Sequence, residues 1–275
     1  MRAFRIAYDG RPFHGFQRQP TVPSVEGRLF DAFDSLGVFD RDDRHRPPGY
    51  AAAGRTDAGV SATAQTVAVE CPEWCTPRAL NGELPADVRA WASAPVPADF
   101  HATHDAARRA YAYHLYAPDL DDERARTAAA TLRGEHDFHN LTTDETGTVR
   151  DLSVEVSREG AFLLLRVAAD GFPRHLVRRI ASVVRGVAAG TQPPEWVHRV
   201  LGPESLDGPE GVPTAPAAPL VLVEVSYPDL VFEPDPEAAA SAAAVFRDRQ
   251  REARVRGRVA DRLASVGDGP TADDS

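Results

Sequence analysis

The sequence contains no lysine, so its basic charge rests entirely on arginine. Its 275 residues include 31 basic and 41 acidic side chains, which give a net charge of −10. An acidic chain does not attract nucleic acid in general, but arginine forms bidentate bonds to phosphate and stacks on aromatic rings. Clustered arginines therefore leave RNA binding open. We interpret the acidic excess as an adaptation to high salt, which predicts lower stability and solubility without added salt.

Cysteines and long apolar runs are also scarce. The two cysteines, Cys71 and Cys75, lie four residues apart, whereas a zinc site needs about four ligands. We therefore expect two free thiols in a reducing compartment. No apolar run reaches the roughly 18 residues needed to span a membrane, and Met1 to Ile6 lacks the apolar region of a signal peptide. The protein is accordingly predicted to be cytoplasmic, without a membrane partner.

One octet, Gly54-Arg55-Thr56-Asp57-Ala58-Gly59-Val60-Ser61, combines groups that suit catalysis. Its glycines permit a tight turn and the close approach of another molecule. Asp57 on such a turn can act as a nucleophile or a base, and Arg55 offers a planar set of donors to a phosphate or carboxylate. Ordinary turns share this composition, so the octet alone leaves both interpretations open.

Other candidate residues lie later in the chain. Arg178 follows the apolar Val177 in a predicted helix, so we expect it to be partly buried and to need a carboxylate partner. Tyr111, in a predicted strand, can stack on a base or pack within the sheet. A metal site is only weakly indicated by two histidines and one acid, at His136, Asp137 and His139.

Periodicity predicts an α+β fold with a mainly antiparallel sheet, because strands outnumber helices and hairpins are present. The strand over 161–168 is almost wholly apolar and is expected to be buried on both faces. The strand over 220–227 is expected to be central. Strands are predicted near 4–8, 63–69, 88–94, 107–116, 149–157, 161–168 and 220–227, and helices over 24–37, 76–84, 121–132, 174–189 and 195–201.

The strand–helix–strand pattern occurs twice, which predicts two similar subdomains at 1–105 and 106–232. A third part, 233–275, is rich in alanine and arginine and is predicted to be an appended helix with a disordered acidic tip. Its seven arginines after Phe246 are interpreted as a solvated face rather than an RNA contact. Its predicted apolar stripe comprises Phe246, Val255, Val259, Leu263 and Val266.

Short segments in a fixed order resemble one family over roughly residues 3 to 228. Each segment is weak alone, and their joint order carries the resemblance. They resemble the tRNA pseudouridine synthases of the TruA type, in an archaeal and halophilic form. The segments are Tyr8-Asp9-Gly10, Gly15–Pro20, Gly54–Val60, Asn81 with Leu84-Pro85, Phe100-His101-Ala102, Arg109–Tyr113, Leu132-Arg133-Gly134 with His136-Asp137-Phe138, Arg174–Arg178 and Val225–Pro228.

The resemblance implies an isomerase that converts uridine to pseudouridine in the anticodon stem-loop of tRNA, at tRNA positions 38, 39 and 40. It implies a homodimer without metal or cofactor, with the active-site cleft between the two subdomains. Asp57 would be the catalytic nucleophile and Arg178 the arginine paired with it. Tyr111 would stack on the target base, and Arg55 would replace the flipped nucleotide or hold its phosphate.

Some residues depart from the family pattern and leave loop shape and choice of position open. Ser61 stands where the family usually has histidine, Pro173 where it usually has leucine, and Ala217-Ala218-Pro219 replaces a usual glycine. Two alternatives also stay open from the sequence. One is an RNA-binding module that uses the same cleft without catalysis. The other is a metal-dependent hydrolase built on His136, Asp137 and His139.

Overall fold

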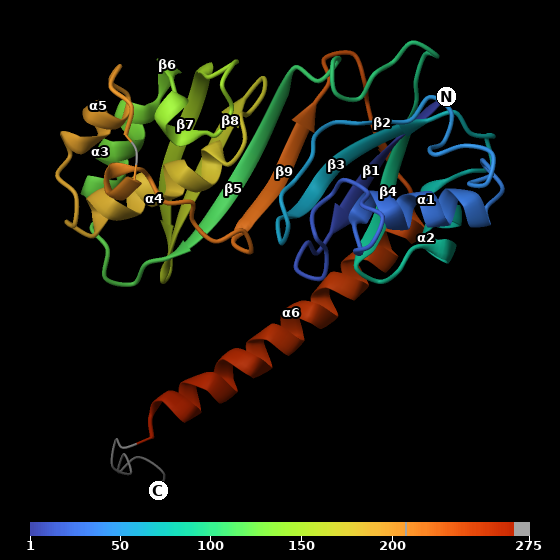
Figure 1. Cartoon of the computed structure of the whole chain (residues 1–275). Helices are drawn as coiled ribbons and strands as arrows, with labels where there is room; N and C mark the ends of the chain where they lie inside the picture. Colours follow the sequence, from blue (N-terminus) through green and yellow to red (C-terminus); the bar gives the residue numbers. More distant parts are fainter. Residues whose placement is uncertain (207, 267–275) are drawn as a thin grey trace, which may run out of the picture.

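A computed structural model describes residues 1–206 and 208–266 (Figure 1). Among these residues, ten strands form one sheet in the order β10-β4-β1-β3-β9-β5-β8-β7-β6, with β2 paired to β3. Only the pairing of β3 with β9 is parallel in this described part. The predicted α+β class with a mainly antiparallel sheet is confirmed. The strands are Arg2–Tyr8 (β1), Ala51–Ala52 (β2), Ser61–Val69 (β3), Val88–Pro95 (β4), Arg108–Tyr116 (β5), Gly134–Asp137 (β6), Val149–Glu159 (β7), Phe162–Ala169 (β8), Leu220–Ser226 (β9) and Glu233–Pro234 (β10).

Strand β9 is central, as its apolar run predicts. Val221 pairs with Ser61 of β3 on one side and with Ala112 of β5 on the other. A strand with neighbours on both edges and cover on its faces favours a near-continuous apolar run. Through β9, the strands of the first and second halves of the chain form one continuous sheet. The boundaries at 105 and 232 stay a prediction.

Helices pack at both ends of the sheet, with α1 and α2 at one end and α3, α4 and α5 at the other (Figure 1). One apolar cluster forms around α1 and includes Phe4 and Phe33. A second forms around α3 and α4 and includes Leu132 and Ile180. Tyr111 packs against both clusters. The helices are Val25–Ser35 (α1), Pro77–Glu83 (α2), Asp122–Leu132 (α3), Leu176–Ala188 (α4), Trp196–Val200 (α5) and Pro236–Ala264 (α6).

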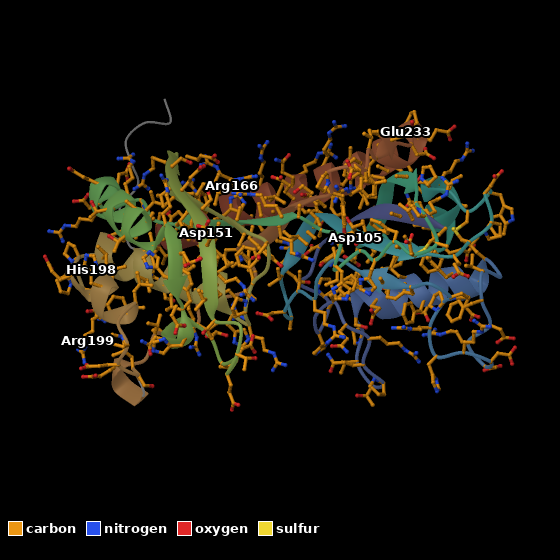
Figure 2. The ribbon with its side chains drawn as sticks, turned by 90° about the horizontal axis from the view of Figure 1, so that it is seen from above. Asp105, Asp151, Arg166, His198, Arg199 and Glu233 are labelled. Atoms are coloured by element: carbon orange, nitrogen blue, oxygen red, sulfur yellow. The ribbon has the colours of Figure 1, made fainter. Side chains whose placement is uncertain are left out.

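The prediction that strand 161–168 is buried on both faces is wrong. Leu163 and Leu165 are buried in the cluster with α3 and α4, whereas Phe162 is 41% exposed. Arg166, labelled in Figure 2, pairs with Glu224 at the surface. Side chains alternate between the faces of a strand, and here the helices cover one face. Apolar side chains on the other face therefore meet solvent.

The predicted C-terminal helix is present as α6. Ala238 and Ala242 are its buried residues, and Arg249 forms ion pairs with Asp9 and Asp87. The predicted single stripe is wrong, because Phe246 and Val255 are nine residues apart and a helix turns by about 900° over that distance, which places them on opposite sides. Phe246 lines a groove against the sheet. The predicted disordered tip, from residue 267 onward, lies outside the described residues.

Candidate active site

Residues 54–60, the Asp57 loop, connect β2 to β3 and are tied to neighbouring strands. Thr56 is buried and bonds twice: its carbonyl accepts from the backbone N–H of Phe16 at 3.0 Å, and its hydroxyl bonds the Tyr8 hydroxyl at 2.8 Å. Gln65 Nε2 donates to the carbonyl of Gly54 at 2.8 Å. Burial raises the pKa of Tyr8, so its hydroxyl stays neutral. These bonds hold the backbone around Asp57 in one conformation.

Two glycines allow this loop to close against the first strand. Gly59 has φ +84°, which favours glycine. A Cβ on Gly10 would lie 1.9 Å from the carbonyl oxygen of Val60, so only glycine fits there. The backbone N–H of Gly10 donates to Ser61 Oγ at 3.0 Å. Ser61, a departure from the family pattern, therefore joins the two loops.

Helix α4 brings Arg178 to Asp57. The Arg178 Nη1 to Asp57 Oδ2 distance is 2.9 Å, and Arg178 Nε donates to the carbonyl of Ala215 at 2.7 Å. The Arg178 side chain is 17% exposed and that of Asp57 is 35% exposed. A partly buried arginine with a carboxylate partner is what the sequence predicts for this position. A charge-assisted bond of this length fixes which way the carboxylate points.

His175 is a second neighbour of Asp57 that was not predicted from the sequence. Its Nε2 lies 3.7 Å from Asp57 Oδ2. Its φ of +62° makes it the single non-glycine residue with positive φ within the described residues. Because His175 leaves the helical region, α4 starts at Leu176, two residues later than predicted. Strained backbone of this kind is concentrated at functional sites, but no spacing in the sequence reveals it.

Tyr111 lies in the same recess as Asp57 and Arg178. Its ring meets that of Phe172 edge-on, with centroids 5.1 Å apart. The recess is small, about 50 Å³, and is also lined by Thr56, Val60 and His175. Burial, opposed by Arg109 and assisted by the charge of Asp57, raises the pKa of Tyr111 to about 12. The ring therefore presents a neutral aromatic surface beside the carboxylate.

Arg109 is buried and joins three loops around this recess. Its Nε and Nη2 donate to the carbonyl of Ala53 at 2.9 and 2.7 Å, and Nη2 also donates to that of Thr103 at 2.6 Å. Its Nη1 donates to the carbonyl of Asp170 at 2.5 Å. Ala53 precedes the Asp57 loop, and Asp170 precedes the segment that carries Phe172 and His175. Arg109 thus sets the distance between the Asp57 loop and the segment that carries Phe172 and His175, which lie on either side of the recess.

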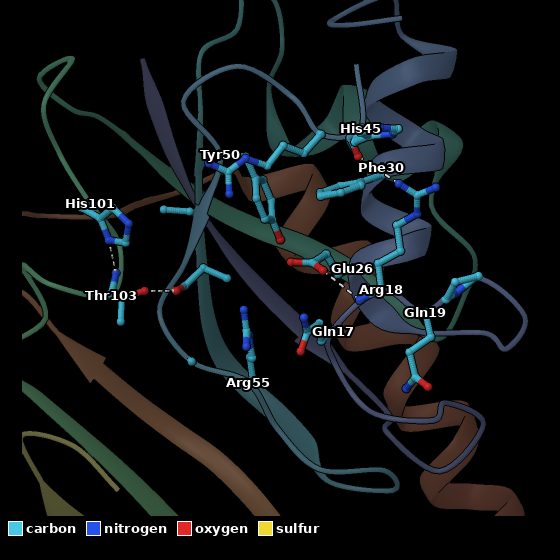
Figure 3. A pocket seen from close by; sticks show the side chains of 15 residues that line it. Gln17, Arg18, Gln19, Glu26, Phe30, His45, Tyr50, Arg55, His101 and Thr103 are labelled. Carbon is cyan, nitrogen blue, oxygen red and sulfur yellow. Dashed lines mark hydrogen bonds between the residues drawn. The ribbon is translucent and has the colours of Figure 1, made fainter. Parts of the chain in front are cut away.

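Arg55 lies outside the recess. Its side chain is exposed and lines a neighbouring groove of about 800 Å³ together with Arg18 and Arg46 (Figure 3). Arg18 donates from its backbone N–H to Glu26 Oε2 at 2.8 Å, and from Nη1 to the carbonyl of His45 at 2.9 Å. Of the four predicted site residues, Asp57, Tyr111 and Arg178 are therefore brought together. Arg55 projects from the same loop into this groove.

The weaker metal candidates do not converge. His136 Nε2 bonds the carbonyl of Arg133 at 3.0 Å, and His139 Nδ1 lies 3.4 Å from Asp137 Oδ2. Within residues 1–206 and 208–266, no group of three or more His, Cys, Asp or Glu side chains is arranged to hold a metal ion. Both cysteines are free thiols. No helix in the described part of the chain has the length and apolar character to cross a membrane.

Comparison with known proteins identifies the family. The family model described as tRNA pseudouridine synthase matches residues 128–228, a span that includes Arg178. The chain is 55% identical over 272 residues to tRNA pseudouridine synthase A of Haloarcula marismortui, and the match covers 96% of the chain and 98% of that relative. The chain belongs to the tRNA pseudouridine synthase A family. Its enzyme class, an isomerase, is thereby confirmed.

Two other archaeal members of the tRNA pseudouridine synthase A family are also similar to this chain over most of its length. The protein of Natronomonas pharaonis is 56% identical over 266 residues, covering 96% of the chain and 99% of the relative. That of Methanothrix thermoacetophila is 39% identical over 238 residues, covering 85% of each. The archaeal and halophilic resemblance of the ordered segments is confirmed.

Proposed function

We propose that this protein isomerises uridine to pseudouridine in tRNA, at positions 38, 39 and 40 of the anticodon stem-loop. The observation that carries the proposal is the Asp57–Arg178 ion pair in a recess that also contains Tyr111. Membership of the tRNA pseudouridine synthase A family supports the reaction and the class of substrate. The three positions come from the resemblance of the ordered segments.

The isomerisation of uridine requires few groups from the protein. The N1–C1′ bond breaks, the uracil turns, and a C5–C1′ bond forms, while C5 loses a proton and N1 gains one. No electrons are exchanged with another molecule, so the isomerisation itself calls for no redox cofactor. The uridine must first leave its stack, which costs a few kcal/mol. The enzyme therefore has to hold a flipped base against one reactive group.

Asp57 is that reactive group and acts as the nucleophile in this proposal. Arg178 stabilises the carboxylate anion and orients it through the 2.9 Å bond. Tyr111 stacks on the flipped uracil. Because its hydroxyl is neutral, the ring can lie beside the Asp57 carboxylate without charge repulsion. A volume of about 50 Å³ is close to that of one or two water molecules. Tyr111 and Phe172 both line this recess, so the base enters beside their edge contact.

Arg55 acts on the RNA rather than on the uracil. It projects from the Asp57 loop into the groove that Arg18 and Arg46 also line. Arginine binds phosphate through a planar fork of donors and also stacks on bases. Arg55 can therefore hold the phosphate of the flipped nucleotide or take the place that its base leaves. Both roles need an exposed guanidinium beside the recess.

Mapping of pseudouridine in tRNA tests the catalytic assignment. tRNA is incubated with the wild-type protein, with Asp57→Ala and with Asp151→Ala as a control. Asp151 is an exposed carboxylate on β7 (Figure 2). We expect Asp57→Ala to lose all activity while it retains its fold and tRNA affinity, and Asp151→Ala to stay active. Activity in Asp57→Ala would refute the assignment. A wild-type protein that binds tRNA without changing any uridine would favour the RNA-binding module.

The same proposal includes a homodimer that acts in the cytoplasm on tRNA. Support for the dimer comes from α6, where Val255, Val259 and Leu263 are 59, 54 and 67% exposed. Apolar side chains at i, i+4 and i+8 share one helix face, and a contiguous exposed apolar face is typical of an interaction surface. Light scattering in high salt measures the mass. A mass of 29.7 kDa, that of one chain, would contradict the dimer.

A further inference from the structure

The last part of α6 stands free of the rest of the molecule. Every residue from Arg251 to Ala264 is exposed, and Figure 1 shows this part of the helix extending away from the sheet. An isolated helical segment of this length is marginally stable in water. Most helices gain their stability from packing. This segment therefore has the properties of a surface that a partner covers.

Arginines form one row along this helix. Arg247, Arg251, Arg254, Arg258 and Arg262 are spaced by four, three, four and four residues, which places them on one face. We call this row the arginine ridge. At about 1.5 Å per residue it is about 22 Å long. All five side chains are exposed, and within the described residues only Arg251 has an ion-pair partner, Asp248.

The arginine ridge faces away from the body of the protein. Ala242, Phe246 and Arg249 face the sheet, and the ridge lies roughly on the opposite side of the helix by the 100° rotation per residue. The apolar face of Val255, Val259 and Leu263 lies between these two sides. The ridge and the face proposed for the dimer are therefore separate surfaces.

Charge complementarity decides which partner fits the ridge. Helix α6 carries seven arginines and four acids, a net charge of +3, whereas the whole chain has a net charge of −10. A polyanion is repelled by most of this protein and attracted where arginines are concentrated. Exposed arginines without carboxylate partners retain their donors for phosphate. An RNA backbone fits these properties.

The middle of helix α6 lies close to the catalytic loop. Phe246 and Arg249 line a groove of about 910 Å³ together with Ser61 and Ala218. Ser61 directly follows the Asp57 loop, and the backbone nitrogen of Ala218 lies 4.0 Å from the position that a Cβ on Gly59 would occupy. The arginine ridge starts at Arg247, next to Phe246 in the chain, and runs outward along the opposite side of the helix. RNA that reaches Asp57 and continues past it can therefore lie along the ridge.

We propose that the arginine ridge of α6 binds the phosphate backbone of the tRNA substrate outside the segment that is modified. This inference rests on the proposed tRNA substrate. The ridge contributes affinity for the whole tRNA, while the recess at Asp57 performs the reaction. The solvated face expected from the sequence is solvated in the free protein and covered in the complex.

The test replaces Arg254, Arg258 and Arg262 together by glutamine. Glutamine has a helix propensity close to that of arginine, and circular dichroism verifies the helix. A matched control, Arg28→Gln with Arg126→Gln and Arg199→Gln, removes the same charge from exposed positions of α1, α3 and α5. Binding is measured with full-length tRNA and with an excised anticodon stem-loop, over a series of salt concentrations. Modification of the stem-loop is measured in parallel.

We expect the ridge variant to bind full-length tRNA at least about tenfold more weakly at the lowest salt concentration. Its plot of log affinity against log salt should be shallower by about 2 to 3, because each lost phosphate contact removes roughly 0.7 to 0.9. Its affinity and turnover for the stem-loop should match those of the wild type, as should both properties of the control variant.

Unchanged tRNA affinity and salt slope in the ridge variant would overturn the proposal, as would an equal loss in the control variant. A change of oligomeric mass at unchanged tRNA affinity would assign the ridge to a second copy of the chain and would also overturn it. If the wild-type protein modifies tRNA in these experiments, the proposed function stands whatever the ridge variant does. A wild-type protein that neither binds nor modifies tRNA would refute the proposed function itself.

Discussion

The pairing of Arg178 with Asp57 leads to a quantitative prediction about stability. Replacement of Arg178 by methionine keeps the apolar stem and removes two bonds, one to Asp57 and one to the carbonyl of Ala215. A bond from a charged donor contributes about 1.5 to 3 kcal/mol. Asp57 is 35% exposed, so its unpaired charge stays partly hydrated and costs less than the roughly 3 to 5 kcal/mol of a fully buried case.

From these terms we expect Arg178→Met to lower the free energy of unfolding by about 3 kcal/mol. In a protein of this size that corresponds to a fall of roughly 6 to 12 °C in melting temperature. In a double-mutant cycle, the coupling energy is the amount by which the effects of Arg178→Met and Asp57→Asn fail to add. It should be about 1 to 2 kcal/mol, between the values for exposed and buried ion pairs. Urea unfolding of the wild type, both single variants and the double variant at one fixed salt concentration measures it.

Arg179 provides the matched control for this cycle. It neighbours Arg178 in α4 but donates to Thr214 and to the carbonyls of Asn140 and Thr142. Arg179→Met should therefore be additive with Asp57→Asn to within about 0.5 kcal/mol. If the coupling energy between Arg178→Met and Asp57→Asn were also below about 0.5 kcal/mol, the 2.9 Å bond would not hold Asp57 in solution.

Three further predictions concern the surroundings of the site. Arg109→Met should lower the free energy of unfolding by about 3 to 5 kcal/mol, because buried carbonyls lose their donor; a loss below about 1 kcal/mol in urea unfolding would contradict the joining of the loops. His175→Gly should be about 1 kcal/mol more stable than His175→Ala, because alanine pays for positive φ; equal urea midpoints would count against the strain. The pKa of Asp9 is lowered in the fold: burial opposes this, but bonds from Arg11 and Arg249 outweigh it. Its stabilising effect should therefore be present above about pH 3.9 and be lost as the pH falls further, and Asp9→Asn should remove that part of the acid sensitivity; an unchanged pH profile would contradict it.

Much of the fold follows from local patterns in the sequence. The residues near 4–8 predicted a strand, which is present as β1, and the continuous apolar run of β9 predicted the central position that the sheet order confirms. The helix predicted over 24–37 also begins as expected, because the Ser24 side chain accepts a bond from the first turn of α1. Burial on both faces of β8 was predicted wrongly, because the sequence does not show which face of a sheet the helices cover.

The sequence by itself determined the chemistry available at the site. The octet with Asp57, the strand with Tyr111 and the helix with Arg178 were recognisable from residue types and their order. An arginine beside an apolar residue also predicted that a carboxylate partner was needed, because a buried charge is costly alone.

Only the tertiary structure decided which groups meet. Asp57 and Arg178 are 121 residues apart in sequence, and β9 and α4 bring them within one hydrogen bond. The positive φ of His175 and the three carbonyls around Arg109 likewise depend on backbone geometry and on neighbours distant in sequence. Local patterns specify secondary structure through short-range periodicity, whereas contacts between distant segments arise only when the whole chain packs.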